Sequence, residues 1–229
     1  KVLEHMVDVV ISFEGDNNNA FRILRAKKNR FGSTSEIGIY EMLSTGLREV
    51  KNPNEIFLTL NSSKLSGCAI GVSMEGIRPL TLEVQALVST AVYGTPQRSS
   101  TGFNSKRLNM LLAVLEKRAG VQLSNKDVFL NITGGVKSED PSLDLAIVSA
   151  ILSSYHDTPI DKKICFASEI GLSGELRPVI RLDKRISEAE KLGYKVFVTS
   201  GCIKESTKRK GIKILELEKI GGLINNLFE

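Results

Sequence analysis

Ser142 lies where a loop meets a helix, a position from which a hydroxyl group could attack a carbonyl carbon. A serine becomes a nucleophile when a neighbouring base removes its proton, and a lysine whose pKa is lowered by burial can be that base. The same residues also suit an ordinary helix start, with Asp140 as the N-cap and Pro141 in the first turn. The segment therefore predicts either a nucleophile or only the first turn of a buried helix over residues 142–155.

A second stretch with chemical potential is the run Lys28-Asn29-Arg30-Phe31-Gly32. Nine residues without an acid contain five basic ones: Arg22, Arg25, Lys27, Lys28 and Arg30. Most basic turns are only solvated surface. At a subunit edge, however, lysine and arginine can stabilise the charge on a phosphoryl group in transfer.

Three strands are expected to carry this basic run, at residues 7–13, 21–26 and 37–42, and the first two should form a hairpin. Three strands without a helix cannot bury both faces, so we expect residues 1–50 to be the edge of a larger α/β domain. The sequence has no G-x-x-x-x-G-K-[ST] motif, so we expect no P-loop nucleotide site in this chain.

Residues 51–229 alternate between strand and helix patterns. Strands are predicted at 68–74, 80–88, 128–132, 164–167, 174–178 and 195–199. Helices are predicted at 104–118, 142–155, 182–192 and 217–227. The stretch 94–103, rich in Gly, Ser and Thr, is expected to be a flexible loop. Together these elements predict an α/β (α+β) fold with a mixed sheet covered by helices.

The composition is that of a globular protein, with 41% hydrophobic residues and a net charge of +5 among 229 residues. This charge permits nucleic acid as a partner without demanding it. No apolar run approaches the roughly 20 residues of a membrane span, and no secretion signal is recognisable, so a cytoplasmic location is expected. The three cysteines and two histidines lack metal-ligand spacing, so we expect no metal site.

The motif KNRFG, preceded by FRILRAK and followed by EIGIYEM, resembles the signature of the RadA (Sms) family of bacterial DNA repair proteins. In that family the motif ends a RecA-like ATPase core. The resemblance implies that residues 1–50 are the last strands of such a core. It also implies that Lys28 and Arg30, with Asn29, Phe31 and Gly32, serve ATP turnover across a subunit boundary and its coupling to DNA. Gly32 is expected to adopt a backbone conformation closed to other residues.

Residues 51–229 resemble the Lon-protease-like domain of the same family, most clearly in LEVQALVS, RLNMLLAVLEKRAG, VFLNITGG and EIGLSGELRPV. Alignment with the Lon protease family places Ser142 and Arg185 at the positions of its Ser-Lys dyad. Arginine stays protonated and cannot act as the base. Lys184 is one residue away, which turns its side chain by about 100° around a helix. The resemblance therefore implies a proteolytically inactive domain, and the alternative is an active peptidase that uses Ser142 with Lys184.

For the parent protein, the resemblance implies an ATP-dependent DNA helicase that promotes branch migration as a hexameric ring. Its expected cofactors are ATP and Mg, with zinc in an N-terminal region outside this chain. Its expected partners are single-stranded and branched DNA and the RecA recombinase. The domain at 51–229 would serve oligomerisation and DNA binding, and the expected DNA contacts are Arg98, Lys106, Arg107, Arg177, Arg181 and Arg185. A third reading is an assembly module without DNA contact.

Overall fold

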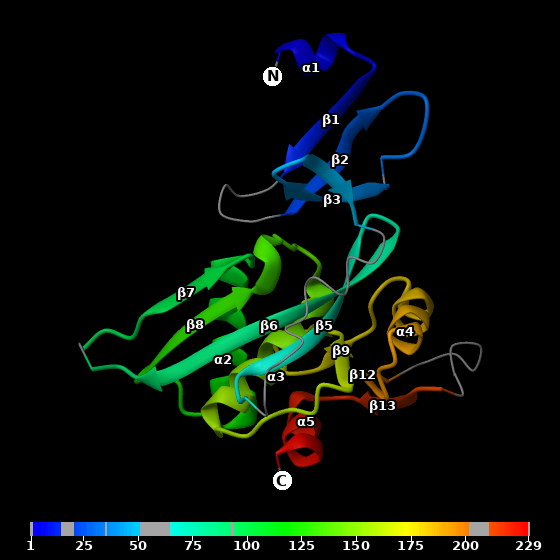
Figure 1. Cartoon of the computed structure of the whole chain (residues 1–229). Helices are drawn as coiled ribbons and strands as arrows, with labels where there is room; N and C mark the ends of the chain where they lie inside the picture. The colour runs from blue at the N-terminus through cyan, green and yellow to red at the C-terminus, as the bar shows by residue number, and fades with distance from the viewer. Residues whose placement is uncertain are drawn as a thin grey trace.

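The computed structural model describes residues 2–14, 21–34, 36–50, 65–92, 94–201 and 211–228. These residues form a four-stranded sheet, a seven-stranded sheet and a two-stranded ribbon (Figure 1). The mixed α/β fold that the sequence predicts is confirmed. The predicted division at residue 50 adjoins residues 51–64, which lie outside the described part.

The small sheet is antiparallel, with the strand order β1-β2-β3-β4. Its elements are α1 (Val2–Met6), β1 (Val9–Glu14), β2 (Phe21–Asn29), β3 (Ile37–Leu43) and β4 (Gly46–Glu49). The predicted hairpin and third strand are confirmed by the pairing of β1 with β2 and of β2 with β3. The strand β4 was not predicted, because its residues are all exposed and carry no buried alternation.

The large sheet has the order β13-β12-β9-β5-β6-β8-β7 and mixes parallel with antiparallel pairs. Its strands are β5 (Cys68–Glu75), β6 (Arg78–Thr90), β7 (Arg98–Thr101), β8 (Lys126–Ile132), β9 (Ile164–Ala167), β12 (Val196–Ser200) and β13 (Lys213–Leu217). The ribbon is β10 (Glu169–Ile170) with β11 (Leu176–Arg177). The helices are α2 (Ser105–Ala119), α3 (Asp144–Tyr155), α4 (Leu182–Lys191) and α5 (Ile220–Leu227).

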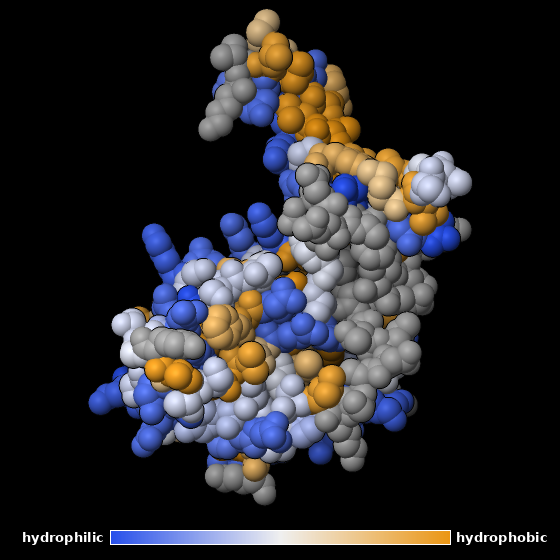
Figure 2. Space-filling model, turned by 60° about the vertical axis from the view of Figure 1, so that its left-hand side comes forward, coloured by the Kyte–Doolittle hydropathy of each residue, from blue (hydrophilic) through white to orange (hydrophobic). Residues whose placement is uncertain are grey.

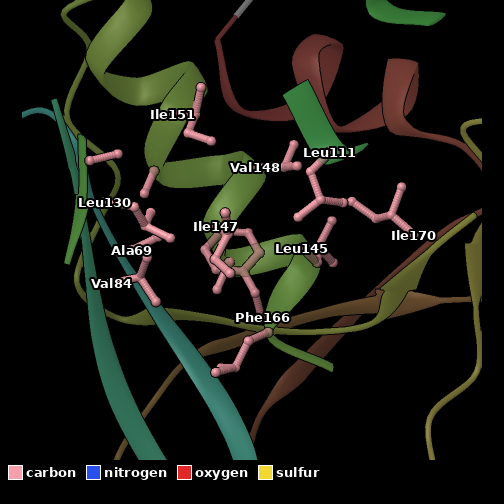
Figure 3. Close-up of a cluster of buried hydrophobic side chains, with 14 of the residues drawn as sticks. Ala69, Val84, Leu111, Leu130, Leu145, Ile147, Val148, Ile151, Phe166 and Ile170 are labelled. Carbon is pink, nitrogen blue, oxygen red and sulfur yellow. The ribbon is translucent and has the colours of Figure 1, made fainter. Parts of the chain in front are cut away.

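Two hydrophobic clusters cover the two faces of this sheet. The larger cluster contains the apolar side chains of α2, α3 and α5, and the smaller one contains Ile186 and Ala189 of α4 with Phe197 of β12. Residues 144–153 of α3 are all buried, the three polar ones Asp144, Ser149 and Ser153 included, as expected of a predominantly apolar helix in a protein core. Figure 3 shows its side chains packed beside Ala69 and Val84 of the β5–β6 hairpin.

Three predicted boundaries were wrong. The expected loop at 94–103 contains the edge strand β7, whose polar sequence Arg-Ser-Ser-Thr gave no strand signal. The helix predicted at 217–227 begins at Ile220, because Leu217 closes strand β13. The strand predicted at 174–178 is reduced to Leu176–Arg177, since Gly174 adopts a turn conformation with φ 81°.

The small sheet contacts the large unit, which we define as elements β5 to α5, through apolar and charged side chains. Ile37 and Ile39 of β3 are buried and belong to the larger hydrophobic cluster. Arg25 of β2 forms an ion pair with Glu75 at the end of β5. Figure 1 shows the small sheet beside this end of the β5–β6 hairpin.

Candidate functional site

Lys28 lies near the end of β2, beside the last turn of α1. Its Nζ donates to the carbonyl oxygens of Glu4 at 3.0 Å and His5 at 3.3 Å. The last carbonyls of a helix have no partner within the helix and carry partial negative charge, so an ammonium group satisfies them. Lys28 thereby fixes α1 to the end of β2, just before the turn at residues 29–33.

The turn itself is built by Asn29 and Arg30. Asn29 Oδ1 accepts from the backbone N–H of Phe31 at 3.0 Å, and Asn29 Nδ2 donates to the carbonyl of Ser33 at 3.3 Å, a side-chain-stabilised turn. Arg30 Nη1 lies 2.9 Å from Asp8 Oδ1, yet 60% of the Arg30 side chain remains exposed. Phe31 is 80% exposed. The segment therefore presents a cation and an aromatic ring to solvent from a defined turn.

The expectation for Gly32 was wrong. The φ of Gly32 is not positive, so its backbone does not occupy the left-handed region. A Cβ added there would lie 3.3 Å from Asn29 Nδ2. The constraint at this position is thus a close approach of the Asn29 amide.

Ser142 lies in a short 3-10 turn, Pro141–Leu143, that leads into α3. The Asp140 side chain caps this turn, because its Oδ1 accepts from the Ser142 N–H at 3.0 Å. Ser142 is fully buried. Its Oγ donates to the carbonyl of Val72 at 3.2 Å and accepts from Arg185 Nη1 at 2.7 Å.

Arg185 of α4 is also fully buried, the largest side chain in the described core. Besides Ser142 Oγ, its Nη1 donates to the Val72 carbonyl at 2.6 Å and its Nε to the Ile180 carbonyl at 3.1 Å. Its Nη2 lies 2.8 Å from Asp140 Oδ2. The guanidinium thus bridges α4, β5 and the start of α3. We call Ser142, Arg185 and Asp140 the buried triad.

The charges of the buried triad compensate each other. Burial opposes ionisation of Asp140, but the Arg185 charge and the backbone N–H groups of Ser142 and Met74 outweigh it and lower the pKa of Asp140. Burial lowers the pKa of Arg185, and Asp140 acts in the opposite direction. The ion pair therefore stays charged inside the protein.

This arrangement is the reverse of what nucleophile activation requires. A general base accepts the proton of a serine hydroxyl, whereas Arg185 donates a hydrogen bond to Ser142 Oγ. Lys184, the alternative base, is exposed on α4, away from the buried side that Arg185 occupies. The residues aligned with the dyad do lie together, and their contacts are those of a structural polar network.

The six expected DNA contacts occupy different environments. Arg98 on the edge strand β7 and Lys106 at the start of α2 are exposed, and Ser100 Oγ lies 2.8 Å from Ser105 Oγ, which brings these elements together. Arg177 and Arg181 are exposed near α4. Arg185 is at variance with its expected role, because a fully buried guanidinium cannot reach a DNA phosphate.

Arg107 has a structural partner. It forms a bidentate ion pair with Asp144, a fully buried carboxylate at the start of α3, and lies 3.6 Å from Glu169 Oε1. Burial raises the pKa of Asp144, and the Arg107 guanidinium and the Ile170 N–H partly offset this. Arg107 thus joins α2 to α3 and β10.

The acidic partners were missed from the sequence. The sequence predicts Asp140 only as a helix cap, and it predicts no ion pair for Asp140, Asp144 or Glu75. Each partner arginine is distant along the chain, so spacing gave no signal. Three buried or nearly buried acids in apolar surroundings are nevertheless a hint, since buried charges are normally paired.

Within the described ranges, His, Cys, Asp and Glu form no group of three that could hold a metal ion. No described helix is both long and apolar enough to cross a membrane.

Comparison with known proteins identifies relatives of the whole chain. A family model described as "Subunit ChlI of Mg-chelatase" matches residues 83–201. The DNA repair protein RadA of Bacillus subtilis is 49% identical over 96% of this chain and 48% of its own length. That of Streptococcus pneumoniae is 47% identical over 100% of the chain and 54% of its own length, and that of Listeria monocytogenes 46% over 96% and 49%. The chain thus spans about half the length of these relatives. It belongs to the ChlI domain family and is a homologue of the RadA DNA repair proteins.

Proposed function

We propose that this chain is the C-terminal region of a RadA-type DNA repair protein, an ATP-dependent DNA helicase that promotes branch migration. The observation that carries the proposal is the 46–49% identity to RadA proteins over nearly the whole chain. In this proposal the small sheet completes a RecA-like ATPase core, and the large unit assembles the ring and contacts DNA.

The Lys28–Gly32 segment is the part of the chain that serves ATP turnover. Arg30, exposed beside Phe31, can reach a neighbouring subunit, where a guanidinium would stabilise the charge on the transferring phosphoryl group. Lys28 holds α1 against the turn and so sets the position from which Arg30 projects. ATP and Mg would be bound mainly by the remainder of the parent protein.

The test uses a longer protein that adds the ATPase part found in the relatives. Its DNA-stimulated ATP hydrolysis is compared with that of Lys28→Ala and Arg30→Ala. Both substitutions are expected to abolish hydrolysis or to uncouple it from DNA. Lys27→Ala is the matched control, since Lys27 lies on the same strand, is 57% exposed and lies 3.7 Å from Glu14. Full DNA-stimulated activity of Lys28→Ala would remove the role proposed for the segment.

The large unit is proposed to be inactive as a peptidase. The supporting observation is the hydrogen bond from Arg185 to Ser142 Oγ inside a fully buried network. We expect no cleavage of casein or short peptides between pH 5 and pH 10. Cleavage that disappears in Ser142→Ala would establish the alternative Ser-Lys peptidase.

DNA binding by the large unit is separable from assembly alone. Arg98 and Lys106, exposed on adjacent elements, and Arg177 and Arg181 are the proposed phosphate contacts. Each phosphate contact on single-stranded DNA contributes about −0.7 to the slope of log affinity against log salt. The double variant Arg98→Ala with Lys106→Ala is therefore expected to make this slope less steep by more than one unit. Absence of salt-dependent binding in the unmodified chain would favour an assembly module without DNA contact.

A further inference from the structure

The tip of the β5–β6 hairpin is held from two sides. Glu75, the last residue of β5, is 7% exposed, and its Oε2 accepts from Arg25 Nη2 at 2.8 Å. Arg25 lies on β2, the strand that also carries Lys28. From the other side, Arg181 Nη1 donates to the carbonyl of Gly76 at 2.5 Å. Arg181 does so from a left-handed backbone with φ 54°, which is uncommon for a residue with a side chain.

The same strand end leads to the buried triad. Met74, next to Glu75, donates its backbone N–H to Asp140 Oδ2 at 2.6 Å. Asp140 Oδ2 in turn lies 2.8 Å from Arg185 Nη2. Burial raises the pKa of Glu75, and Arg25 acts against this shift. The charge of Asp140 raises the pKa of Glu75 further, so the two carboxylates interact electrostatically. Consecutive contacts therefore run from β2 through β5 to the buried triad.

We propose that the Arg25–Glu75 ion pair is the joint through which the large unit positions the Lys28–Gly32 segment, with the buried triad anchoring its far side. Arg25 and Glu75 are then positioning residues for the ATP-coupled activity, an assignment whose functional part rests on the function proposed above. The large unit then acts as a rigid support, because Ser142 and Arg185 hydrogen-bond to Val72 of β5, and the end of β5 forms the ion pair with the small sheet.

An ion pair is suited to this role for a physical reason. Apolar packing of Ile37 and Ile39 against the core is non-directional and permits the small sheet to rotate. The Arg25–Glu75 contact is directional. Glu14 Oε2 at the end of β1 lies 3.5 Å from Arg25 Nε and restrains the guanidinium from a second side. Loss of Arg25 would leave Glu75 buried and unpaired, which favours separation of the two sheets.

Amide hydrogen exchange in the chain itself tests the joint. Glu75→Ala and Arg25→Ala are each expected to accelerate exchange in residues 22–30 by roughly tenfold or more. Acceleration should extend to Met74 and to residues 140–142. If both residues act through one contact, the double variant should exchange no faster than the more affected single variant, because effects within one interaction are not additive.

Arg48→Ala is the matched control. Arg48 forms an ion pair with Glu41 in the same small sheet, between β3 and β4, and does not touch the large unit through that pair. Its removal should alter exchange only in β3 and β4. If Glu75→Ala does not fold, the partly exposed Arg25→Ala variant carries the test alone. The proposal would be refuted if amide exchange at residues 28–30 were unchanged in that variant. It would also be refuted if the accelerations of the two single variants multiplied in the double variant.

The functional consequence is read in the longer protein as the ratio of ATP turnover with and without single-stranded DNA. Glu75→Ala is expected to lower this ratio, and Arg48→Ala to leave it unchanged. If Lys28→Ala lowers the ratio to about one but Glu75→Ala leaves it unchanged, the positioning role of the Arg25–Glu75 pair is refuted while the proposed function stands. If Lys28→Ala has no effect, the proposed function fails, and the exchange experiment alone decides on the joint.

Discussion

The buried triad shows how one residue changes the character of a site. The Arg185 guanidinium places Ser142 in a buried network of hydrogen bonds, in which its Nη2 contributes an ion pair with Asp140 and no hydrogen bond. Removal of the guanidinium would leave the Asp140 carboxylate without its counter-charge in a largely buried place.

We therefore expect Arg185→Ala to lower the free energy of unfolding by about 3–5 kcal/mol. Ser142→Ala, which removes one hydroxyl and its neutral contacts, should cost about 1 kcal/mol. Urea unfolding followed by circular dichroism measures both. Arg177→Ala is the control, because its ion pair with Glu175 is exposed, and its midpoint should not move. An Arg185→Ala midpoint equal to that of the unmodified chain would contradict this account.

The pKa of Asp140 predicts a pH dependence with a definite sign. Since its pKa is lowered in the folded protein, the unfolded chain binds the proton more tightly. Asp140 therefore contributes stability above its unfolded pKa of about 3.9, and this contribution is lost as the pH falls toward the lower folded value. Asp144 and Glu75, whose pKa values are raised, contribute with the opposite sign.

The measurement is thus a difference. The unfolding free energy of the unmodified chain minus that of Asp140→Asn should shrink as the pH is lowered below about 4. A difference that grows with acidification would show that the pKa of Asp140 is raised instead.

Close packing between elements is most demanding where β5 crosses the start of α3. A Cβ at Gly71 would lie 2.5 Å from Leu143 Cδ2 and 3.0 Å from Ala146 Cβ. Gly71→Ala should therefore force α3 away from the sheet and lower the unfolding free energy by about 1–3 kcal/mol.

Gly221→Ala is the comparison, since a Cβ in that helical position of α5 meets nothing within 4 Å. It should stabilise the protein by about 0.5–1 kcal/mol through helix propensity. Thermal unfolding of both variants checks the pair. A stabilised Gly71→Ala would show that α3 can move at little cost.

Elements with buried alternation or helical periodicity were predictable from the sequence. The β5–β6 hairpin, α2 with its Asn104 and Gly120 caps, and α3 all matched their expected positions closely. The strands β4 and β7 were not predicted, because an edge strand with exposed side chains needs no apolar pattern.

Of the site, the sequence predicted the helix cap at Asp140, and the family resemblance predicted that Ser142 and Arg185 lie together. The ion pair of Arg185 with Asp140 spans a long stretch of chain, and charge alone does not reveal which acid an arginine will meet.

At the scale of the whole molecule, the small sheet exposes an apolar face. Ile11 and Phe13 of β1 are 58% and 46% exposed, on the side of the sheet opposite Ile39. The Phe13 and Tyr40 rings lie 6.2 Å apart on this face. Figure 2 shows the hydrophobic surface of this part of the molecule. In the proposed parent protein, the rest of the ATPase core would cover it.

The isolated chain should therefore self-associate through this face. Sedimentation velocity is expected to show a concentration-dependent rise in apparent mass that Ile11→Lys reduces. Leu172→Lys, an equally solvent-accessible apolar site in the large unit at 65% exposure, is the control and should leave the rise in place. Equal behaviour of both variants would place the association elsewhere.

The contacts of Arg185 also make this position intolerant of lysine. Lysine has three donors on one nitrogen, whereas Arg185 uses three separate nitrogens to reach the Val72 and Ile180 carbonyls, Ser142 and Asp140. A lysine in place of Arg185 would leave several of these groups unsatisfied, so the support that Arg185 gives to β5 would be lost. A Ser-Lys pair could therefore be installed at this position only together with further substitutions around Val72, Ile180 and Asp140.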